Sequence, residues 1–408
     1  MAAPPGPAPL RRRNTLRAER TQLLFALAGT GLGLLLPRIT RGPQASGAQV
    51  NDMLLGLGLG VLGLTAVIFS MLFLVVQWAH TSFTPRLTMF RNSPLVWQTF
   101  AFAISLALYS LTAVLSTGTR PHVTVMVPAA AGLLLLVLLG LLRALQLRAF
   151  SAIQLAPVLH AVSERGHAVL STLYDRGNVP ATVRPSVQGP LPRPTATVTW
   201  SRPHAVLQQI DMDQLLRAAR RADAVVALKM APGTALPPGT VVADIHGDLE
   251  ASAVFPCLVT GVERTFDQDP LLAFRILADI VLRALSPGVN DPATAVQGLD
   301  HLEDLLAVPA PASCELLHFA DKEGTVRVMV ALPGWQDFLH TGIDDVIAAA
   351  LASPMTLTRL RTLLMRLHTL EHPDRHEQLE GRLAWVEAEL AQRFPLLWKE
   401  TRGASPTE

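Results

Sequence analysis

The 408-residue chain is poor in cysteine, in charge and in aromatic side chains. Its two cysteines, Cys257 and Cys314, are far apart in the sequence. They form neither a disulfide framework nor a thiolate metal site, which suits a reducing cytosol. Charged residues make up 16% of the chain and hydrophobic residues 50%. With a mean hydropathy of +0.34, the chain is too apolar for an ordinary soluble protein.

The sequence also lacks the motifs of well-known catalytic and cofactor-binding sites. It has no nucleophile elbow, phosphate loop, dinucleotide fingerprint, paired metal-ligand helix or zinc knuckle. We therefore expect no catalytic residue, no metal and no cofactor. The formal charge of +2 is small, and the basic residues gather near the N-terminus and beside apolar runs. This distribution favours membrane topology over nucleic-acid binding.

Four apolar runs predict a membrane anchor. They cover Leu23–Leu36, Met53–Val76, Leu95–Leu115 and Val123–Leu142. The last three are long enough to cross a hydrocarbon core of about 30 Å, because a helix rises about 1.5 Å per residue. The first is short, and the basic residues before it also fit a cleaved signal peptide. No small-x-small cleavage site follows closely, which favours a fourth membrane helix.

Basic residues in the short connections predict the orientation. The N-terminal segment is strongly basic, Arg86 and Arg91 lie in the second connection, and Arg143 and Arg148 close the fourth run. The positive-inside rule then places both termini in the cytoplasm, in a multi-pass protein of the cell (inner) membrane. The lipid bilayer is the first expected partner.

Glycines of the second run have a spacing that lets membrane helices approach closely. Gly56, Gly60 and Gly63 follow a small-xxx-small pattern. Packing inside the bundle explains this pattern, and a contact between identical chains or a pore-lining face are the alternatives. We expect a homo-oligomer.

The composition changes after Arg148, so the expected fold is a four-helix transmembrane bundle followed by a cytoplasmic α+β domain. The predicted organisation is a basic tail (1–20), a transmembrane region (21–148), a helical stalk (149–177), a proline-rich linker (178–204), the α+β domain (205–398) and a disordered tail (399–408). Strands are expected over 205–210, 224–230, 240–245 and 256–262, and a β-hairpin over 315–319 and 325–330. Helices are expected to follow over 336–351, 356–369 and 374–393.

The densest pattern of the predicted domain runs from Arg264 to Leu306. Asp269-Pro270 and Asp291-Pro292 each predict a helix start, with the carboxylate as N-cap and proline as first helical residue. Between them, Ser286-Pro287-Gly288 predicts the end of the first helix, since proline cannot continue it.

A polar connection between these two helices is the candidate site. The start of a helix offers free N–H groups and the positive end of its dipole to an anion or a carboxylate. This predicts a ligand- or partner-binding site formed by Arg283, Ser286, Asn290, Asp291 and Thr294. The alternative is that these residues only cap the helices. The sequence leaves the ligand unknown.

A family resemblance is carried by Arg264-Thr265, Gln268-Asp269 and the residues 285–292. The segments 82–87 and 210–213 belong to the same resemblance. Together they resemble the signature of the bacterial domain-of-unknown-function family 2254, a family of predicted membrane proteins. The resemblance covers most of the chain before Pro309. It implies membrane helices followed by a soluble domain, and it implies no activity.

Three functions are compatible with this organisation. The first is a membrane-anchored sensor or regulator whose cytoplasmic domain acts on the bundle through the stalk. The second is an oligomeric passive ion channel gated by that domain. The third is an enzyme with an unrecognised site, for example Mg²⁺ held by Asp269, Asp279 and Asp291, and it is the least favoured.

Two histidine patterns have spacings that could bring metal ligands together. His368, His372 and His376 are four apart, but Pro373 interrupts the helix that would align them. His160 and His167 share one face of the stalk, where a solvated or packed pair is the simpler explanation.

Overall fold

A computed structural model of the chain describes residues 17–39, 42–82, 94–174, 193–308, 316–370 and 375–403. These residues form two compact units, one ending at Val158 and one beginning at Leu159. We call them the helical unit and the α/β unit. Several predicted features lie outside the described residues: the first part of the basic tail, the connection with Arg86 and Arg91, residues 175–192 of the stalk and linker, Cys314, His372 and the last five residues.

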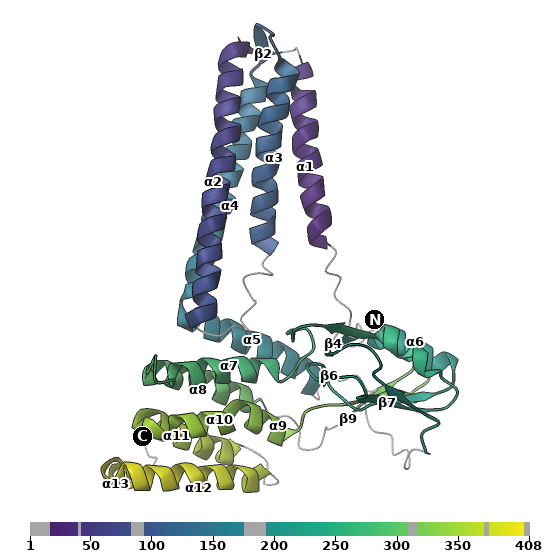
Figure 1. Cartoon of the computed structure of the whole chain (residues 1–408), viewed down its shortest axis with the longest axis vertical. Helices are drawn as coiled ribbons and strands as arrows, with labels where there is room; N and C mark the ends of the chain where they lie inside the picture. The colour runs from purple at the N-terminus through teal and green to yellow at the C-terminus, as the bar shows by residue number, and fades with distance from the viewer. Residues whose placement is uncertain are drawn as a thin grey trace, which may run out of the picture. The chain divides into compact units, whose positions relative to one another are not determined.

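The helical unit consists of long helices and one two-stranded sheet (Figure 1). Its elements are α1 (Arg17–Leu35), a 3₁₀ turn (Leu36–Arg38), β1 (Gln44–Ser46), α2 (Gly47–Ser82), α3 (Pro94–Thr117), β2 (His122–Thr124) and α4 (Met126–Ile153). The two strands are antiparallel, with Ala45 opposite Val123. Because β1 precedes α2 and β2 precedes α4, the small sheet ties the starts of these two helices together.

Helix α3 lies at the centre of the helical unit. In the most apolar segment of α3, 44% of the residues are buried. In the corresponding segments of α2 and α4 only 17% are buried. Its hydroxyl groups donate to backbone carbonyls: Ser105 Oγ to Phe25 at 2.6 Å, and Tyr109 Oη to Val127 at 2.8 Å. Helices α2 and α4 turn large apolar side chains outward, among them Leu59, Phe73, Leu133 and Leu136. An exposed apolar surface of this kind is typical of contact with lipid.

Within the described residues, three helices are long and apolar enough to cross a membrane. These segments are Gly47–Leu74, Leu95–Thr117 and Met126–Arg148. The four predicted spans are therefore not confirmed. Helix α1 falls short because Glu19 and Arg20 lie in its first turn. Its apolar part, from Leu23 on, covers only about 20 Å of a core that measures about 30 Å.

Helices α1 and α3 approach closely through glycine. A Cβ added to Gly29 would lie 2.2 Å from the carbonyl oxygen of Ser105, and one added to Gly33 would lie 2.6 Å from that of Tyr109. The two glycines are four residues apart, the spacing that allows membrane helices to pack backbone against backbone. The close helix contact of this unit is therefore on α1.

The glycines that the sequence singled out on α2 do not pack inside the unit. The Cβ positions of Gly56, Gly60 and Gly63 have no atom within 4 Å, whereas that of Gly58 lies 3.2 Å from Ser110 Cβ of α3. Packing inside this bundle is therefore the wrong explanation for the three glycines, because their face of α2 is turned away from α3.

Helix α5 (Leu155–Tyr174) follows α4 after one extended residue, Gln154, and belongs to the α/β unit from Leu159 on. It covers most of the described part of the predicted stalk. The strands of the unit are β3 (Ala196–Thr199), β4 (Ala205–Ile210), β5 (Val225–Leu228), β6 (Ala235–Leu236), β7 (Val241–His246), β8 (Leu258–Gly261), β9 (Leu316–Ala320) and β10 (Val326–Ala331).

Its remaining helices alternate with these strands and then close the chain. They are α6 (Met212–Arg221), α7 (Leu272–Ala284), α8 (Pro292–Leu306), α9 (Trp335–Leu339), α10 (Asp345–Ala349), α11 (Pro354–Leu370), α12 (His376–Arg393) and α13 (Pro395–Gly403). Short 3₁₀ turns cover Ala251–Ala253, Phe255–Cys257 and Ala350–Ala352. The fold class is confirmed in its coarse form, apolar helices followed by a region of helices and sheets.

Two sheets organise the α/β unit. The larger has the strand order β3-β7-β5-β10-β9, in which only the β5–β10 pair is parallel, and the smaller has the order β6-β4-β8. The predicted hairpin is confirmed, with β9 and β10 antiparallel around the turn at Gly324. Asp211 caps α6, since its Oδ1 accepts from the backbone N–H of Gln214 at 3.0 Å.

The helix expected over 336–351 is confirmed, but it contains a π turn (His340–Asp344) between α9 and α10 that the sequence did not predict. The reason is local packing: the Cβ position of Gly342 is 3.3 Å from Leu302 and 3.5 Å from Phe274. The widened turn brings the backbone of Gly342 against α7 and α8.

Alanine at two glycines of α1 tests the packing of the helical unit. Gly29→Ala and Gly33→Ala should each lower the free energy of unfolding by about 1 to 3 kcal/mol, because the new methyl group displaces the backbone of α3. Gly31 lies between them with open space around its Cβ position. Gly31→Ala should therefore be neutral or stabilising by up to about 1 kcal/mol. Thermal unfolding in detergent measures the difference, and equal melting temperatures for the three variants would contradict the α1–α3 contact.

Candidate functional site

A buried ion pair lies at the centre of the stretch that begins at Arg264. Arg264 donates from Nε and Nη2 to the two carboxylate oxygens of Asp269, at 2.6 and 2.7 Å. The side chain of Asp269 is 1% exposed. Burial raises the pKa of this carboxyl group, and the guanidinium of Arg264 opposes that shift. A buried pair of this kind costs about 3 to 5 kcal/mol when one partner is removed.

The surrounding backbone fits closely around this pair. Gly233 has a φ of +98°, and a Cβ there would lie 2.3 Å from Asp269 Oδ2, so only glycine is accommodated. The neighbouring Gln268 donates to and accepts from the backbone of Ile210, at 3.3 and 2.8 Å. These bonds join the end of β4 to the segment that leads into α7. Arg264, Gln268 and Asp269 therefore hold the sheet and the helices together.

The predicted helix start at Asp269-Pro270 is wrong by two residues. Helix α7 begins at Leu272, and Leu271 occupies the N-cap position without a side-chain cap. Asp269 Oδ1 accepts from the backbone N–H of Leu271 at 3.0 Å, but its carboxylate is mainly bound by Arg264. Arg264, only five residues earlier in the sequence, thus takes the carboxylate that was predicted to cap the helix.

The second predicted helix start is confirmed. Asp291 is the N-cap of α8, with Pro292 as the first helical residue. One carboxylate oxygen accepts from the backbone N–H of Thr294 at 3.1 Å and the other from its hydroxyl at 2.6 Å. The Thr294 hydroxyl and backbone N–H lower the pKa of Asp291. Its cap therefore stabilises the folded state above the ordinary aspartate pKa of about 4, and this contribution is lost as the pH falls.

The other predicted site residues lie in or beside the same turn. Ser286 Oγ donates to the carbonyl of Arg283 at 2.7 Å, so the serine is used to end α7. Asn290 is exposed and has a φ of +48°, a left-handed conformation that asparagine tolerates better than most residues. Arg283 lies in the last turn of α7. The hydroxyl of Ser286 and the carboxylate of Asp291 are thus engaged within the turn, whose residue Val289 is 47% exposed.

Helix α5 contacts this central stretch at several points, which the sequence did not indicate. A Cβ on Gly166 would lie 2.7 Å from Cβ of Ala273 and 2.9 Å from Leu305, so α5 packs tightly on α7 and α8. The guanidinium of Arg165 lies 5.4 Å from the centre of the Phe266 ring. Gly166, a lone glycine between Arg165 and His167, is the sequence feature that could have indicated this docking.

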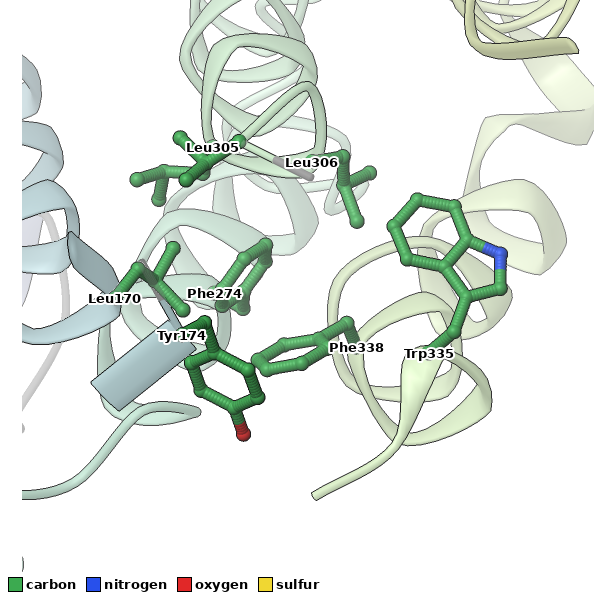
Figure 2. A pocket seen from close by; sticks show the side chains of 8 residues that line it. Leu170, Tyr174, Phe274, Leu305, Leu306, Trp335 and Phe338 are labelled. Atoms are coloured by element: carbon green, nitrogen blue, oxygen red, sulfur yellow. The ribbon is translucent and has the colours of Figure 1, made fainter. Parts of the chain in front are cut away.

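An apolar pocket lies where α5 meets these helices. It is lined by Leu170, Tyr174, Phe274, Leu305, Leu306, Val308, Trp335 and Phe338, most of which are labelled in Figure 2. The Tyr174 ring meets Phe338 edge-on at 5.6 Å, and its hydroxyl donates to Pro333 at 2.9 Å. Its cavity volume is only about 10 Å³. This is roughly the minimum that holds a single water molecule, so we assign no ligand to it.

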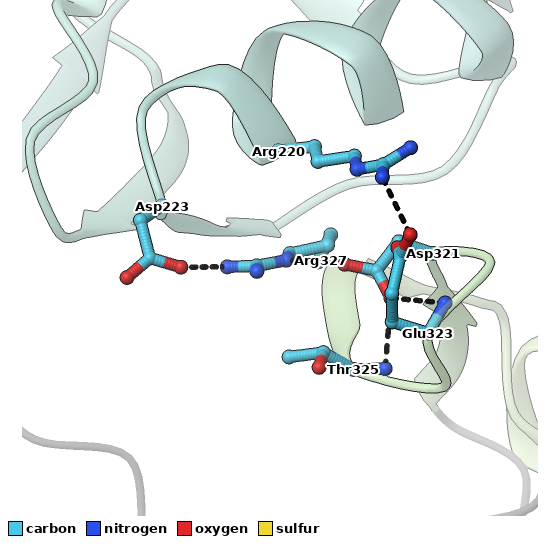
Figure 3. Close-up of polar contacts among 6 residues, drawn as sticks. All are labelled: Arg220, Asp223, Asp321, Glu323, Thr325 and Arg327. Atoms are coloured by element: carbon cyan, nitrogen blue, oxygen red, sulfur yellow. Dashed lines mark hydrogen bonds and ion pairs between the residues drawn. The ribbon is translucent and has the colours of Figure 1, made fainter.

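A second polar cluster holds the β9–β10 hairpin to the end of α6 (Figure 3). Arg327 binds Asp321 at 2.8 Å and Asp223 at 2.7 Å, and Arg220 binds Glu323 at 2.5 Å. Asp321 also accepts from two backbone N–H groups of its turn. The bond from Arg327 is the main cause that lowers the pKa of Asp321. Each of these charges has a partner within the fold, which indicates a structural role.

The described carboxylates and histidines that the sequence offers as metal ligands each interact with a different partner. Asp279 pairs with Arg275 at 2.9 Å, while Asp269 and Asp291 have the partners described above. His368 and His376 stack with ring centres 4.0 Å apart. Among the residues that the structure describes, no three His, Cys, Asp or Glu side chains gather into a possible metal site.

Comparison with known proteins agrees with this architecture. The model of a family described as "Predicted membrane protein (DUF2254)" matches residues 20–366. Uncharacterized proteins of Mycobacterium tuberculosis and Mycobacterium bovis are each 26% identical to the chain over 396 residues, which covers 90% of this chain and 74% of theirs. No solved structure matches the chain.

Two substitutions in the turn separate capping from backbone strain. Asp291→Ala should lower the free energy of unfolding by about 1 kcal/mol, because the N-cap of α8 is lost. Asn290→Gly should lower the free energy of unfolding by a few tenths of a kcal/mol at most, since glycine adopts the left-handed backbone conformation readily. Chemical unfolding at pH 7 measures both. The difference between wild type and Asp291→Ala should shrink below about pH 4, because the Asp291 carboxylate is protonated first in the unfolded chain and, at lower pH, also in the folded protein. A deficit that stays constant down to pH 2 would contradict the capping role.

Proposed function

The chain belongs to the DUF2254 family of predicted membrane proteins, and we propose that it is a membrane-anchored sensor or regulator. In this proposal the α/β unit binds a ligand or partner and acts on the membrane helices through α5. The observation that carries it is the position of α5. The helix begins one residue after α4 ends and is packed into the α/β unit by Gly166.

The packing of α5 supports a role beyond tethering. Val162 and Leu170 on this helix are almost fully buried, and Arg165 and Gly166 contact the segments around α7. A change in how α7 and α8 pack would therefore move α5 as a rigid rod. Because only Gln154 separates it from α4, such a movement would reach the last turns of that helix.

We further propose that α1 is a fourth membrane span. Its close packing on α3 through Gly29 and Gly33 supports this. An even number of spans returns the chain to its starting side. With the basic N-terminal segment inside, both termini and the α/β unit are cytoplasmic, in a cell (inner) membrane.

The turn between α7 and α8 is the proposed contact site of the α/β unit. Arg283, Ser286, Asn290, Asp291 and Thr294 shape it. Since the Ser286 and Asp291 side chains are already hydrogen-bonded within the turn, a partner protein that contacts the exposed Val289 fits better than a small anion.

Disrupting the packing of α5 tests the coupling. Gly166→Val should undock α5, because the added carbon atoms meet Ala273 and Leu305. Backbone amides of α5 and of the last turns of α4 should then exchange faster in full-length protein in nanodiscs. Gly381→Val is the control, since Gly381 on α12 has open space around its Cβ position. Faster exchange in α5 with no change in α4 would contradict the coupling.

Ion flux decides between this proposal and a passive channel. The interior of the helical unit is filled by side chains such as Leu54, Leu106 and Tyr109, all 1% exposed or less. A pore would therefore have to lie between chains. Liposomes containing the full-length protein should show no more K⁺, Na⁺ or Cl⁻ flux than empty liposomes. Flux that Gly166→Val changes and Gly381→Val does not would replace the regulator with a gated channel.

The open glycine face of α2 is the proposed contact between identical chains. Gly56, Gly60 and Gly63 have no atom within 4 Å of their Cβ positions, and glycine faces allow close helix pairing in lipid. Gly60→Leu should therefore reduce the dimer fraction in cross-linking experiments in liposomes. Gly140→Leu, at an equally open position on α4, is the control. The proposed contact fails if both variants keep the wild-type dimer fraction, or if the wild type is monomeric.

A further inference from the structure

Helix α12 lies on the outside of the α/β unit, beyond α11 (Figure 1). Its inner face carries the buried apolar residues Leu379, Val386 and Leu390. Several of its charged side chains are also used inside the unit. Arg382 donates to Asp344 at 2.8 Å, and Glu387 pairs with Arg361 of α11 at 2.8 Å. The contacts with the rest of the unit therefore occupy both the apolar inner face and the charged flanks of α12.

The opposite side of α12, which we call its outer face, is exposed and uncharged. The exposed residues between Ala384 and Gln392 are Ala384, Trp385, Ala388 and Gln392. Trp385 is 39% exposed, and Leu396 at the start of α13 is 78% exposed. The solvent side of a surface helix is normally polar or charged. An exposed tryptophan in uncharged surroundings is instead typical of the centre of a protein interface.

Charges of opposite sign lie at the two ends of the outer face. Glu377 and Glu380 are exposed near the start of α12, whereas Arg393 and Lys399 are exposed at its end and in α13. If two such helices pair antiparallel, the acidic start of one lies beside the basic end of the other, and the helix dipoles oppose each other favourably. A parallel pair would bring like charges together. The face therefore complements a second copy of itself in one orientation.

We propose that two copies of the chain pair through the outer face of α12, antiparallel and about a two-fold axis near Ala388. Each copy then offers the same surface to the other, and Trp385 packs on the small side chains of the second helix. One helix face is smaller than the roughly 800 Å² per partner of a stable interface. The contact is therefore weak by itself and relies on both chains being held in one membrane. It is separate from the α2 contact and does not require the regulatory role.

Cross-linking at single cysteines tests the contact in the full-length protein in liposomes. All variants carry Cys314→Ser, and Cys257 is buried. Ala388→Cys should cross-link between chains, with a short bis-maleimide, several-fold more than Val262→Cys. Val262, after β8, is 93% exposed and reports random collisions between chains in the same membrane. Equal yields at the two positions would overturn the proposal.

A mixture of two variants tests the antiparallel orientation. Ala384 and Gln392 lie one helical turn before and after Ala388. Differently tagged Ala384→Cys and Gln392→Cys chains should therefore cross-link with each other, and each only weakly with itself. The reverse result would show parallel pairing and would contradict the proposed contact.

Surface substitutions in the Ala388→Cys chain test what holds the contact together. Trp385→Ala should lower the yield several-fold, because tryptophans at interface centres dominate binding. Leu316→Ala, at a position of β9 that is 48% exposed, is the control and should not. Glu377→Lys should also lower the yield, and adding Lys399→Glu should restore part of it. Wild-type yields in both Trp385→Ala and Glu377→Lys, at unchanged melting temperature, would exclude this face as the contact.

Discussion

The α/β unit depends on the buried ion pair of Arg264 and Asp269. It fixes the segment that passes from β8 to α7, and this segment connects the two sheets to α7 and the helices that follow in the same unit. A buried carboxylate is tolerated only when its charge and its hydrogen-bond capacity are satisfied. The guanidinium of Arg264 and the backbone N–H of Leu271 meet both needs. Gly233, which leaves room for the carboxylate, is as necessary as the charges.

The helical unit also has to satisfy polar groups away from water, and it does so without ion pairs of this kind among the residues described here. In lipid, an unsatisfied polar group is expensive and apolar burial gives helices no reason to associate, so close packing and internal hydrogen bonds take over. Helix α3 combines both. Its hydroxyls at Ser105 and Tyr109 donate to carbonyls, and α1 packs against it through Gly29 and Gly33. The apolar residues that a soluble protein would bury are instead turned outward on α2 and α4.

The sequence predicted the features that depend on neighbouring residues. The β4 strand, the β9–β10 hairpin and the cap at Asp291 were all confirmed, because a turn or a cap is decided within a few positions. It failed where the folded backbone decides which groups meet. Arg264, five residues before Asp269, binds the carboxylate that was predicted as a cap. The π turn at Gly342, which packs close to Phe274 and Leu302, was not predicted either. The glycines of α2 had the right spacing for close packing, but spacing alone does not tell which neighbour a helix face meets.

The family signature therefore describes how the domain is built more than what it does. Arg264, Gln268 and Asp269 form internal bonds, and Asp291 caps a helix, so none of these side chains is left to act on a substrate. A chemical function would have to lie elsewhere, yet the pocket beside α5 is small and apolar. The surface on which α5 docks is formed by neighbours of the signature, Phe266, Ala273 and Leu305. Since α5 begins one residue after α4 ends, this docking directs the search for function to α5.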